Sequence, residues 1–324
     1  MSASKTKIIS NWLFVTAFFV FCMAIIGAIT RLTESGLSMV EWRPLIGTVP
    51  PLSQEEWQRV FDLYKQTPEY QKEHFWMGID DFKYIFFWEW FHRFWGRLIG
   101  LIYALPLAFF WVKGWIPVSF KPKLLGLLAL GAAQAVMGWY MVESGLVDMP
   151  SVSHYRLAAH LSLAFVIFAA LVWVGLEMRD GQHVRLTNMS PLGAGSLVIL
   201  SVTIIWGAYV AGLDAGLVYN TWPLMDDRLI PGESFAATSV LSDPVWVQFT
   251  HRWLAIIAAA VTLAYAWRVK SAVLAAAIVF QIVLGIATLL SQVWIPLAAL
   301  HQAGAFIVVL AFLHNAYHQS KKTV

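Results

Sequence analysis

The sequence predicts an all-α, polytopic membrane protein with eight transmembrane helices, arranged as two tandem pseudo-symmetric four-helix bundles. Three observations predict this fold. Of 324 residues, 59% are hydrophobic and 13% are charged, whereas soluble domains carry about 25% charged residues. Eight apolar stretches are long enough to cross a bilayer, which takes about 20 residues. Matching residues also recur in the two halves. A soluble globule and a disordered chain are therefore excluded.

The apolar stretches follow one another along the chain with short inner connections. The first follows Lys5 and Lys7; it is too long for the hydrophobic region of a signal peptide and lacks a small-x-small cleavage motif. The fifth begins at Ser190-Pro191, an N-cap residue followed by a proline at the first helical position. The expected spans are Ile8–Thr30, Trp88–Trp111, Pro122–Met141, Ser153–Leu176, Pro191–Gly212, Pro244–Trp267, Ser271–Leu290 and Pro296–Tyr317.

The distribution of charge predicts the orientation in the membrane. With the N-terminus inside, the inner segments carry eleven Lys and Arg residues and two acidic residues. The outer side carries eleven Lys and Arg residues and seventeen acidic residues. Cytoplasmic segments are enriched in Lys and Arg, so we expect both termini in the cytoplasm. No arginine-rich transit segment precedes the first span, which favours the bacterial plasma (inner) membrane over an organelle.

Composition excludes several classes of site and partner. The single cysteine, Cys22, excludes a disulfide within the chain, a thiolate zinc site and an iron–sulfur cluster. The net charge of +3 gives no electrostatic support for a nucleic-acid partner. The lipid bilayer is the partner that the composition itself predicts.

The first outer loop, from Arg31 to about Phe87, contains a predicted amphipathic helix. A capping-box pattern at residues 53–56 precedes an apolar stripe spaced i, i+3, i+4, i+7. We expect this helix to lie on the membrane surface or to cap the bundle. Its stripe consists of Trp57, Val60, Phe61 and Tyr64.

An internal repeat divides the chain into two four-helix halves. Residues 1–180 form the expected N-terminal half with the long outer loop, and residues 181–324 form the C-terminal half. Four spans per half give both halves the same topology, with a two-fold axis along the membrane normal. The matched pairs include Gly27 with Gly207, His92 with His251, Gln134 with Gln281, Gly138 with Gly285, and His160 with His301.

Four of the nine histidines are candidate haem ligands. His92, His160, His251 and His301 lie on spans two, four, six and eight, each four to seven residues past its expected helix start, or roughly 6–10 Å deep. Two facing imidazoles in a four-helix bundle suit a haem with an axial ligand on each face. Zinc is a weaker alternative because further ligands are lacking. Hydrogen bonds to neighbouring helices are the structural alternative.

The other five histidines are assigned no chemistry. We expect them to be solvated or interfacial, because they lie in loops or near the ends of spans. They are His74, His154, His183, His314 and His318.

Five arginines near the outer ends of the spans are candidates to bind haem propionates. Arginine pairs with carboxylates through two parallel hydrogen bonds. The alternative is that these side chains extend to the interface or pair with loop acids. They are Arg31, Arg93, Arg97, Arg156 and Arg252.

Glu89 is the clearest difference between the halves. It precedes His92 by three residues and shares its helix face, whereas Gln248 holds the matching position before His251. A carboxylate accepts protons and stabilises a developing positive charge, so Glu89 is a candidate catalytic group. The alternative is an interfacial acid that pairs with Arg93.

Several strings around these residues are distinctive. They include TRLTESGLSM at residues 30–39, EWFHR at 89–93, AGLDAG at 211–216, YNTWPLM at 219–225, QFTHR at 248–252 and LHQAGA at 300–305. At these positions the chain closely resembles the haem A synthase family, and the resemblance covers nearly the whole sequence. One branch of that family has a cysteine pair in the first outer loop. This chain resembles the cysteine-free branch shared by some bacteria and mitochondria.

The resemblance implies an oxidoreductase. Successive hydroxylations would convert the C8 methyl group of haem O to a formyl group, giving haem A for terminal oxidases. It implies that His251 and His301 ligate the iron of a bound haem b. His92 and His160 would flank the iron of the substrate haem O, with Glu89 as the catalytic carboxylate. Implied partners are haem O synthase, cytochrome oxidase assembly factors and an unidentified electron-transfer protein.

Two other classes of function share some of these features. A di-haem transmembrane electron-transfer cytochrome b would use the four histidines but gives no reason for the difference between Glu89 and Gln248. A secondary transporter would also contain repeats and membrane histidines. A transporter, however, should have breaks at the midplane, whereas these histidines are expected to lie shallow.

Overall fold

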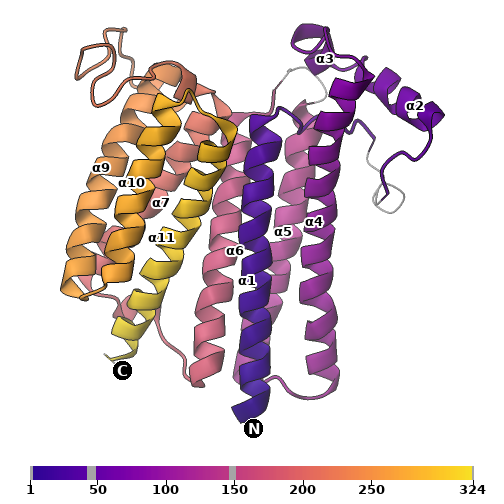
Figure 1. Ribbon diagram of the computed structural model, residues 1–324. Coiled ribbons are helices and arrows are strands. Elements are labelled where there is room, and N and C mark those ends of the chain that lie inside the picture. The colour runs from indigo at the N-terminus through magenta and orange to yellow at the C-terminus, as the bar shows by residue number, and fades with distance from the viewer. Residues whose placement is uncertain (1–2, 42–48, 146–150, 323–324) are drawn as a thin grey trace.

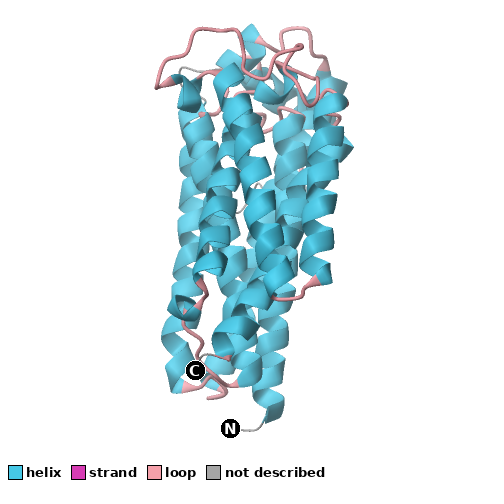
Figure 2. Ribbon diagram, turned by 90° about the vertical axis from the view of Figure 1, so that its left-hand side faces the viewer, coloured by secondary structure: helices cyan, strands magenta, loops and turns pink. Residues whose placement is uncertain are grey.

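The structure of the protein, a computed structural model, describes residues 3–41, 49–145 and 151–322. In those ranges the regular secondary structure is helical and no strand is assigned. Within them, eight helices are long and apolar enough to cross a membrane. They run side by side along the length of the molecule (Figures 1 and 2). The predicted all-α, eight-span fold is therefore confirmed. The long helices are α1 (Ala3–Leu32), α4 (Ile79–Val112), α5 (Lys121–Gly145), α6 (His154–Asp180), α7 (Pro191–Gly212), α9 (Pro244–Arg268), α10 (Ala272–Leu290) and α11 (Ile295–Lys321).

The long helices form two groups of four. Helices α1, α4, α5 and α6 lie on one side, the N-terminal group, and α7, α9, α10 and α11 lie on the other, the C-terminal group (Figure 1). Both termini lie at one end, as an even number of spans requires (Figure 1). We term the opposite end the outer end. That this end faces the outside, that the halves divide at residue 180, and that a two-fold axis relates them all stay predictions.

The two groups meet along α1 and α6 on one side and α7 and α11 on the other. Phe165 of α6 stacks on Phe306 of α11 with ring centroids 3.8 Å apart. Gln302 donates a 2.6 Å hydrogen bond from Nε2 to the backbone oxygen of Ala24 in α1. Phe306 is 0% exposed. Because lipid tails are as apolar as a helix surface, such a contact stabilises the helix association through van der Waals packing rather than through exclusion of water.

The amphipathic helix of the first outer loop is α2 (Gln54–Tyr64), and α3 (Pro68–Lys72) follows it. The Ser53 hydroxyl caps α2 by accepting a hydrogen bond from the backbone N–H of Glu56. The aromatic stripe of α2 rests on the outer end of α4, with Phe61 and Tyr64 each about 5 Å from the Phe82 ring. Helix α2 therefore packs against the outer end of α4, and its placement on the membrane surface stays a prediction.

Helix α4 begins nine residues before its predicted start at Trp88. Asp80 and Asp81 lie in its first turn, where carboxylates favour a helix N-terminus. His92 therefore lies 13 residues after Ile79, whereas the other three candidate histidines lie six or seven residues after their helix starts. The expectation that each histidine lies four to seven residues past its helix start is wrong for His92, because α4 begins before its apolar segment.

Candidate active site

The structure brings the four candidate histidines together in two pairs. His92 on α4 and His160 on α6 belong to the N-terminal group, and His251 on α9 and His301 on α11 belong to the C-terminal group. Each group of helices therefore contains one pair of inward histidines, contributed by two different helices.

Three of these histidines have a buried ring nitrogen that no neighbour satisfies. Within the described ranges, no hydrogen-bond partner reaches Nδ1 of His92, His160 or His251. Leaving a buried polar atom unpaired costs about 1–3 kcal/mol, so the sites fit a group that engages imidazole rings. Paired imidazoles suit an axially ligated haem iron. The described residues contain no cluster of three or more His, Cys, Asp or Glu side chains suited to a metal ion, so the donor set does not favour zinc.

A glutamine supports the second histidine of each pair from the adjacent helix. Gln134 of α5 donates from Nε2 to the backbone oxygen of His160 at 3.1 Å. Gln281 of α10 makes the same bond to His301 at 2.9 Å. The same Nε2 atoms lie 3.3 and 3.2 Å from a ring nitrogen of His160 and His301, respectively. These glutamines hold the helix backbone that carries each imidazole.

Glu89 is buried and held by three partners. Its Oε2 accepts hydrogen bonds from the Ser38 hydroxyl at 2.7 Å and the Met39 backbone N–H at 2.6 Å. Its Oε1 pairs with the guanidinium of Arg93. The side chain is 3% exposed. The predicted pairing with Arg93 is thus present, and the first outer loop fixes the carboxylate one helical turn from His92.

At the matching position in the other half, Gln248 lies beside an arginine in a similar set of hydrogen bonds but carries no charge. Gln248 donates from Nε2 to the Tyr219 backbone oxygen at 3.0 Å, and Arg252 donates to that oxygen at 2.9 Å. In the N-terminal group, Arg93 likewise donates to the backbone oxygen of Met39 at 3.2 Å. Met39 and Tyr219 are 180 residues apart in the sequence, the offset at which Gly27 matches Gly207. Arg93 and Arg252 therefore make equivalent hydrogen bonds to loop backbone oxygens, and the carboxylate is specific to the N-terminal group.

Two of the candidate propionate-binding arginines are engaged elsewhere. Arg31 forms a 2.6 Å ion pair with Asp214, which ties the first outer loop to the third. The guanidinium of Arg156 lies 4.4 Å from the centre of the Tyr140 ring, a favourable cation–π distance.

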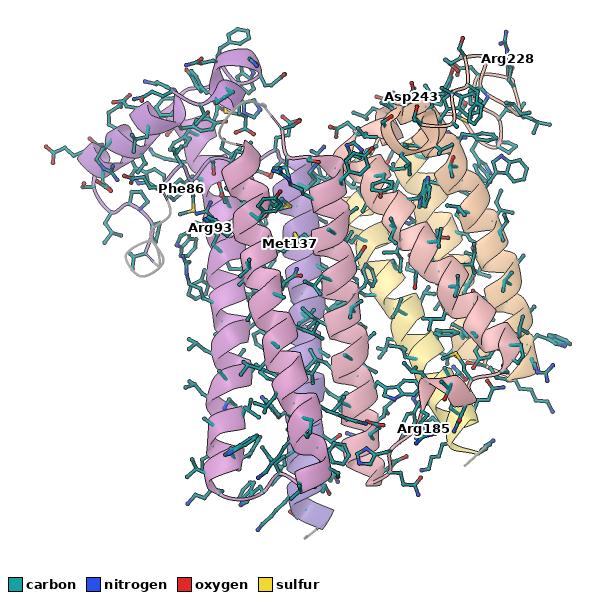
Figure 3. The ribbon with its side chains drawn as sticks, turned by 180° about the vertical axis from the view of Figure 1, so that it is seen from behind. Phe86, Arg93, Met137, Arg185, Arg228 and Asp243 are labelled. Atoms are coloured by element: carbon teal, nitrogen blue, oxygen red, sulfur yellow. The ribbon has the colours of Figure 1, made fainter. Side chains whose placement is uncertain are left out.

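Two other arginines keep a buried donor atom free. Arg97 Nη1 and Arg252 Nε have no hydrogen-bond partner within the described ranges. The remaining bonds of Arg252 with loop residues 221 and 224 go to backbone oxygens. In the N-terminal group, Arg93 of α4 and Met137 of α5 lie at nearly the same height, toward the outer end (Figure 3).

His74 is buried, so the expectation of a solvated or interfacial residue is wrong for it. It is 5% exposed; Nδ1 lies 2.7 Å from the Tyr64 hydroxyl and Nε2 lies 2.9 Å from Glu34 Oε2. The hydrogen bond with Glu34 raises the pKa of His74. The Tyr64 hydroxyl also donates to Glu69 at 2.9 Å, and burial raises the pKa of Glu69 to about 8.

This buried polar network joins three segments of the first outer loop, so sequence periodicity gives no signal for it. The expectation of solvent exposure is confirmed for His183, His314 and His318. His154 lies at the start of α6, with Nε2 3.0 Å from the Leu241 backbone oxygen.

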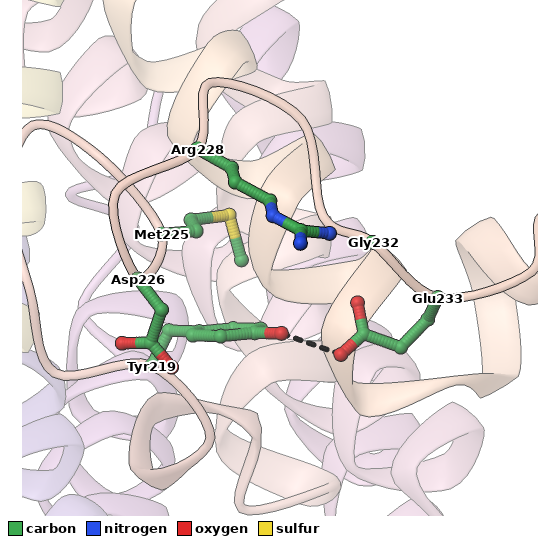
Figure 4. Close-up of a pocket in the computed structure, with 6 residues that line it drawn as sticks. All are labelled: Tyr219, Met225, Asp226, Arg228, Gly232 and Glu233. Carbon is green, nitrogen blue, oxygen red and sulfur yellow. Dashed lines mark hydrogen bonds between the residues drawn. The ribbon is translucent and has the colours of Figure 1, made fainter.

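The third outer loop forms an open pocket at the outer end. Figure 4 shows the Tyr219 hydroxyl donating a hydrogen bond to Glu233, with Arg228 above them. This pocket is lined by loop residues 219–233 and contains none of the four candidate histidines. We therefore look for the function of the protein at the histidine sites rather than at this pocket.

The fold and the site define a class: a polytopic all-α membrane protein with paired histidines in each of two groups of four helices. A sequence profile described as "Cytochrome oxidase assembly protein" matches residues 10–313. The chain belongs to this family.

Relatives in the family are similar over nearly their whole length. A heme A synthase from Rhodospirillum centenum is 49% identical over 95% of this chain and 87% of its own. A heme A synthase from Maricaulis maris is 46% identical over 98% of this chain and 97% of its own. A third, from Parvibaculum lavamentivorans, is 45% identical over 93% and 91%. The resemblance found in the sequence motifs is therefore confirmed.

Proposed function

We propose that this protein is a haem A synthase, an oxidoreductase that converts the C8 methyl group of haem O to a formyl group. Relatives of this name align along nearly the entire chain, and the family is described by its role in cytochrome oxidase assembly. The observation that carries the proposal is the buried Glu89 beside His92, which has only an amide counterpart in the other half. A di-haem electron carrier gives no use for this difference and is not favoured.

The two histidine pairs have different roles in this proposal. His92 and His160 flank the iron of the substrate haem O, and His251 and His301 ligate a haem b that stays bound. The unsatisfied Nδ1 atoms at three of these residues support both sites. When bound, haem b supplies one-electron redox chemistry. The protein holds both macrocycles within the bilayer and excludes bulk water from the imidazoles.

Glu89 acts on the substrate in the N-terminal group. Oxidising a methyl group to a formyl group releases protons and builds positive charge beside the ring, which a carboxylate stabilises in a low-dielectric site. The ion pair with Arg93 and the hydrogen bonds from Ser38 and Met39 fix the position of the carboxylate. Gln248 performs no such step because an amide does not accept a proton at neutral pH.

Arg97 and Arg252 are the proposed partners of haem propionates, one in each group. Each has a buried nitrogen without a hydrogen-bond partner in the described part of the chain. A propionate would accept a charge-assisted hydrogen bond from that nitrogen.

The surroundings follow from the same proposal. The chain is a multi-pass membrane protein, and we place it in the bacterial plasma membrane with both termini in the cytoplasm. The positive-inside distribution of Lys and Arg supports this orientation. Haem O synthase, oxidase assembly factors and an electron-transfer protein are the proposed partners.

Expression in a host that makes haem O but no haem A tests the function. We expect acid–acetone extracts of these membranes to contain haem A, and the purified protein to show a low-spin haem b spectrum. Extracts with haem O alone, from membranes that contain the folded protein, would contradict the proposal. A host with the empty vector provides the baseline.

A further inference from the structure

Each of the four candidate histidines sits against a glycine of an adjacent helix. A Cβ atom added to any of these glycines would lie 2.9–3.2 Å from the imidazole Cε1 atom. Carbon atoms in favourable contact lie about 3.5–4.0 Å apart, so each glycine gives space that alanine would fill. The pairs are Gly27 of α1 with His92, Gly138 of α5 with His160, Gly207 of α7 with His251, and Gly285 of α10 with His301.

Backbone conformation does not explain these glycines. All four lie inside helices, and positive φ angles among the described glycines occur at Gly114 and Gly181. A glycine inside a helix is about 0.5–1 kcal/mol less favourable than alanine. Glycine nevertheless occurs at four helical positions that each lie against an imidazole. The contact with the imidazole is therefore the reason we infer for glycine at these positions.

Other helical glycines are of two kinds. Gly175, Gly193, Gly212 and Gly304 also pack closely, against Phe14, Met189, His154 and Gln281, respectively. By contrast, no neighbouring atom among the described residues lies within 4 Å of a Cβ added to Gly195 of α7 or Gly131 of α5. Each shares its helix with one of the four glycines in question. Close packing at a helical glycine is therefore not confined to the histidine sites. The four proposed positions share a narrower feature, because in each of them the imidazole Cε1 atom is the nearest neighbour of the missing Cβ.

We propose that Gly27, Gly138, Gly207 and Gly285 are positioning residues for the four histidines. Each lets one imidazole edge rest on the backbone of the neighbouring helix, which fixes the rotation of the ring and its distance from the middle of the group. This inference rests on the proposed haem sites. In the C-terminal group the glycines set the geometry of haem b ligation.

In the N-terminal group the same contacts set the place of the substrate. The position of His92 and His160 determines where the haem O iron lies, and so how the C8 methyl group stands relative to Glu89. Displacing a reacting atom by about 1 Å can reduce a rate by about 10²-fold. An added Cβ at Gly138 would have to move the His160 ring, whose Cε1 would lie 3.2 Å from it.

The first test compares Gly207→Ala with Gly195→Ala, two identical changes in α7. For the purified holoprotein, we expect Gly207→Ala to shift the low-spin electron paramagnetic resonance g-values and to lower haem b content several-fold. Gly195→Ala should match the wild type in both. Equal spectra and equal haem content in the two variants would overturn the proposal.

A second measurement is independent of haem chemistry. If Gly207 acts through the His251 ring, Gly207→Ala should lower the thermal unfolding temperature of the otherwise wild-type protein. In a His251→Ala background the ring is gone, so the same change should raise it, because alanine favours the helix. A decrease of the same size in both backgrounds would show a packing role unrelated to His251 and would refute the inference.

The N-terminal group is tested by Gly138→Ala against Gly131→Ala in α5. We expect Gly138→Ala to reduce haem O turnover at saturating substrate about 10²-fold and to leave the haem b spectrum unchanged, with Gly131→Ala active. Equal activity of both variants would overturn the role of Gly138. If the wild type itself does not convert haem O, the proposed function fails, whereas the Gly207 and His251 unfolding test still decides the positioning role.

Discussion

Replacing Glu89 by glutamine separates the proposed chemistry from the structure around it. The change keeps the side-chain volume and removes the charge and the basicity. Loss of a general base or charge-stabilising group lowers a rate by about 10²–10⁴-fold, equivalent to about 3–5 kcal/mol of barrier. We expect haem O conversion to fall by that factor or to stall at a hydroxylated intermediate.

The structure also predicts that this variant folds. The Ser38 hydroxyl can reverse its hydrogen bond, whereas the Met39 N–H and the Arg93 guanidinium each lose a charged acceptor. An unsatisfied buried donor costs about 1–3 kcal/mol. The other half already accommodates an amide beside an arginine, since Arg252 lies 3.4 Å from Gln248 Oε1. Haem b content should therefore be normal in Glu89→Gln.

The assay incubates purified protein with haem O and separates the extracted haems by chromatography and mass spectrometry. The matched control is Glu177→Gln, which removes the charge of another buried carboxylate. Glu177 is 1% exposed, is paired with Lys123 and lies near the C-terminal end of α6. We expect the control to convert haem O normally. Wild-type rates of haem A formation by Glu89→Gln would refute the catalytic role and leave Glu89 as the structural partner of Arg93.

Three further predictions concern the histidines and the outer loop. His251→Ala or His301→Ala should remove or weaken bound haem b, and an unchanged low-spin spectrum in both variants would contradict the assignment. His92→Ala or His160→Ala should abolish or cripple conversion while keeping haem b, and normal haem A formation in both would move the active site elsewhere. The pKa of Glu69 rises from an ordinary value of 4.5 to about 8 in the folded protein. The folded loop therefore binds this proton more tightly, so its stability is full below pH 4.5 and declines as the pH rises toward 8. The protection of α2 and α3 against hydrogen exchange, relative to the intrinsic rate at each pH, should fall over that range, and Glu69→Gln should flatten this dependence; an equal slope in both proteins would rule out Glu69 as its source.

Hydropathy was sufficient to predict the spans because bilayer-crossing segments need a long apolar stretch, and all eight were found within the described residues. The same property could not predict the start of α4. A hydropathy window reports where the chain enters the apolar layer, whereas helix ends depend on caps and first-turn charges such as Asp80 and Asp81.

The candidate site was predictable in its residues but not in its contacts. Repeats and spacing identified the four histidines and the difference between Glu89 and Gln248. The pairing of Glu89 with Arg93 at i+4 was expected from the sequence. The other two partners, Ser38 and Met39, lie about 50 residues earlier in the chain, and no local pattern predicts such a contact. The burial of His74 was missed for the same reason, because Glu34 reaches it from 40 residues away.

The glycines illustrate the limit of repeat analysis. The sequence paired Gly27 with Gly207 and Gly138 with Gly285 without assigning them a role. Their role depends on which side chain the neighbouring helix presents to the missing Cβ, and only the packed helices provide that information.

Conversion of isotopically labelled haem O by the purified wild-type protein tests the central claim most directly. The label distinguishes the added substrate from the haem that is already bound. If the N-terminal group oxidises haem O while the C-terminal group retains haem b, the label should appear in haem A and its hydroxylated precursor, and the bound haem b should remain unlabelled. Recovery of all the label as unchanged haem O, from protein with intact haem b and a suitable electron-transfer partner, would contradict the account.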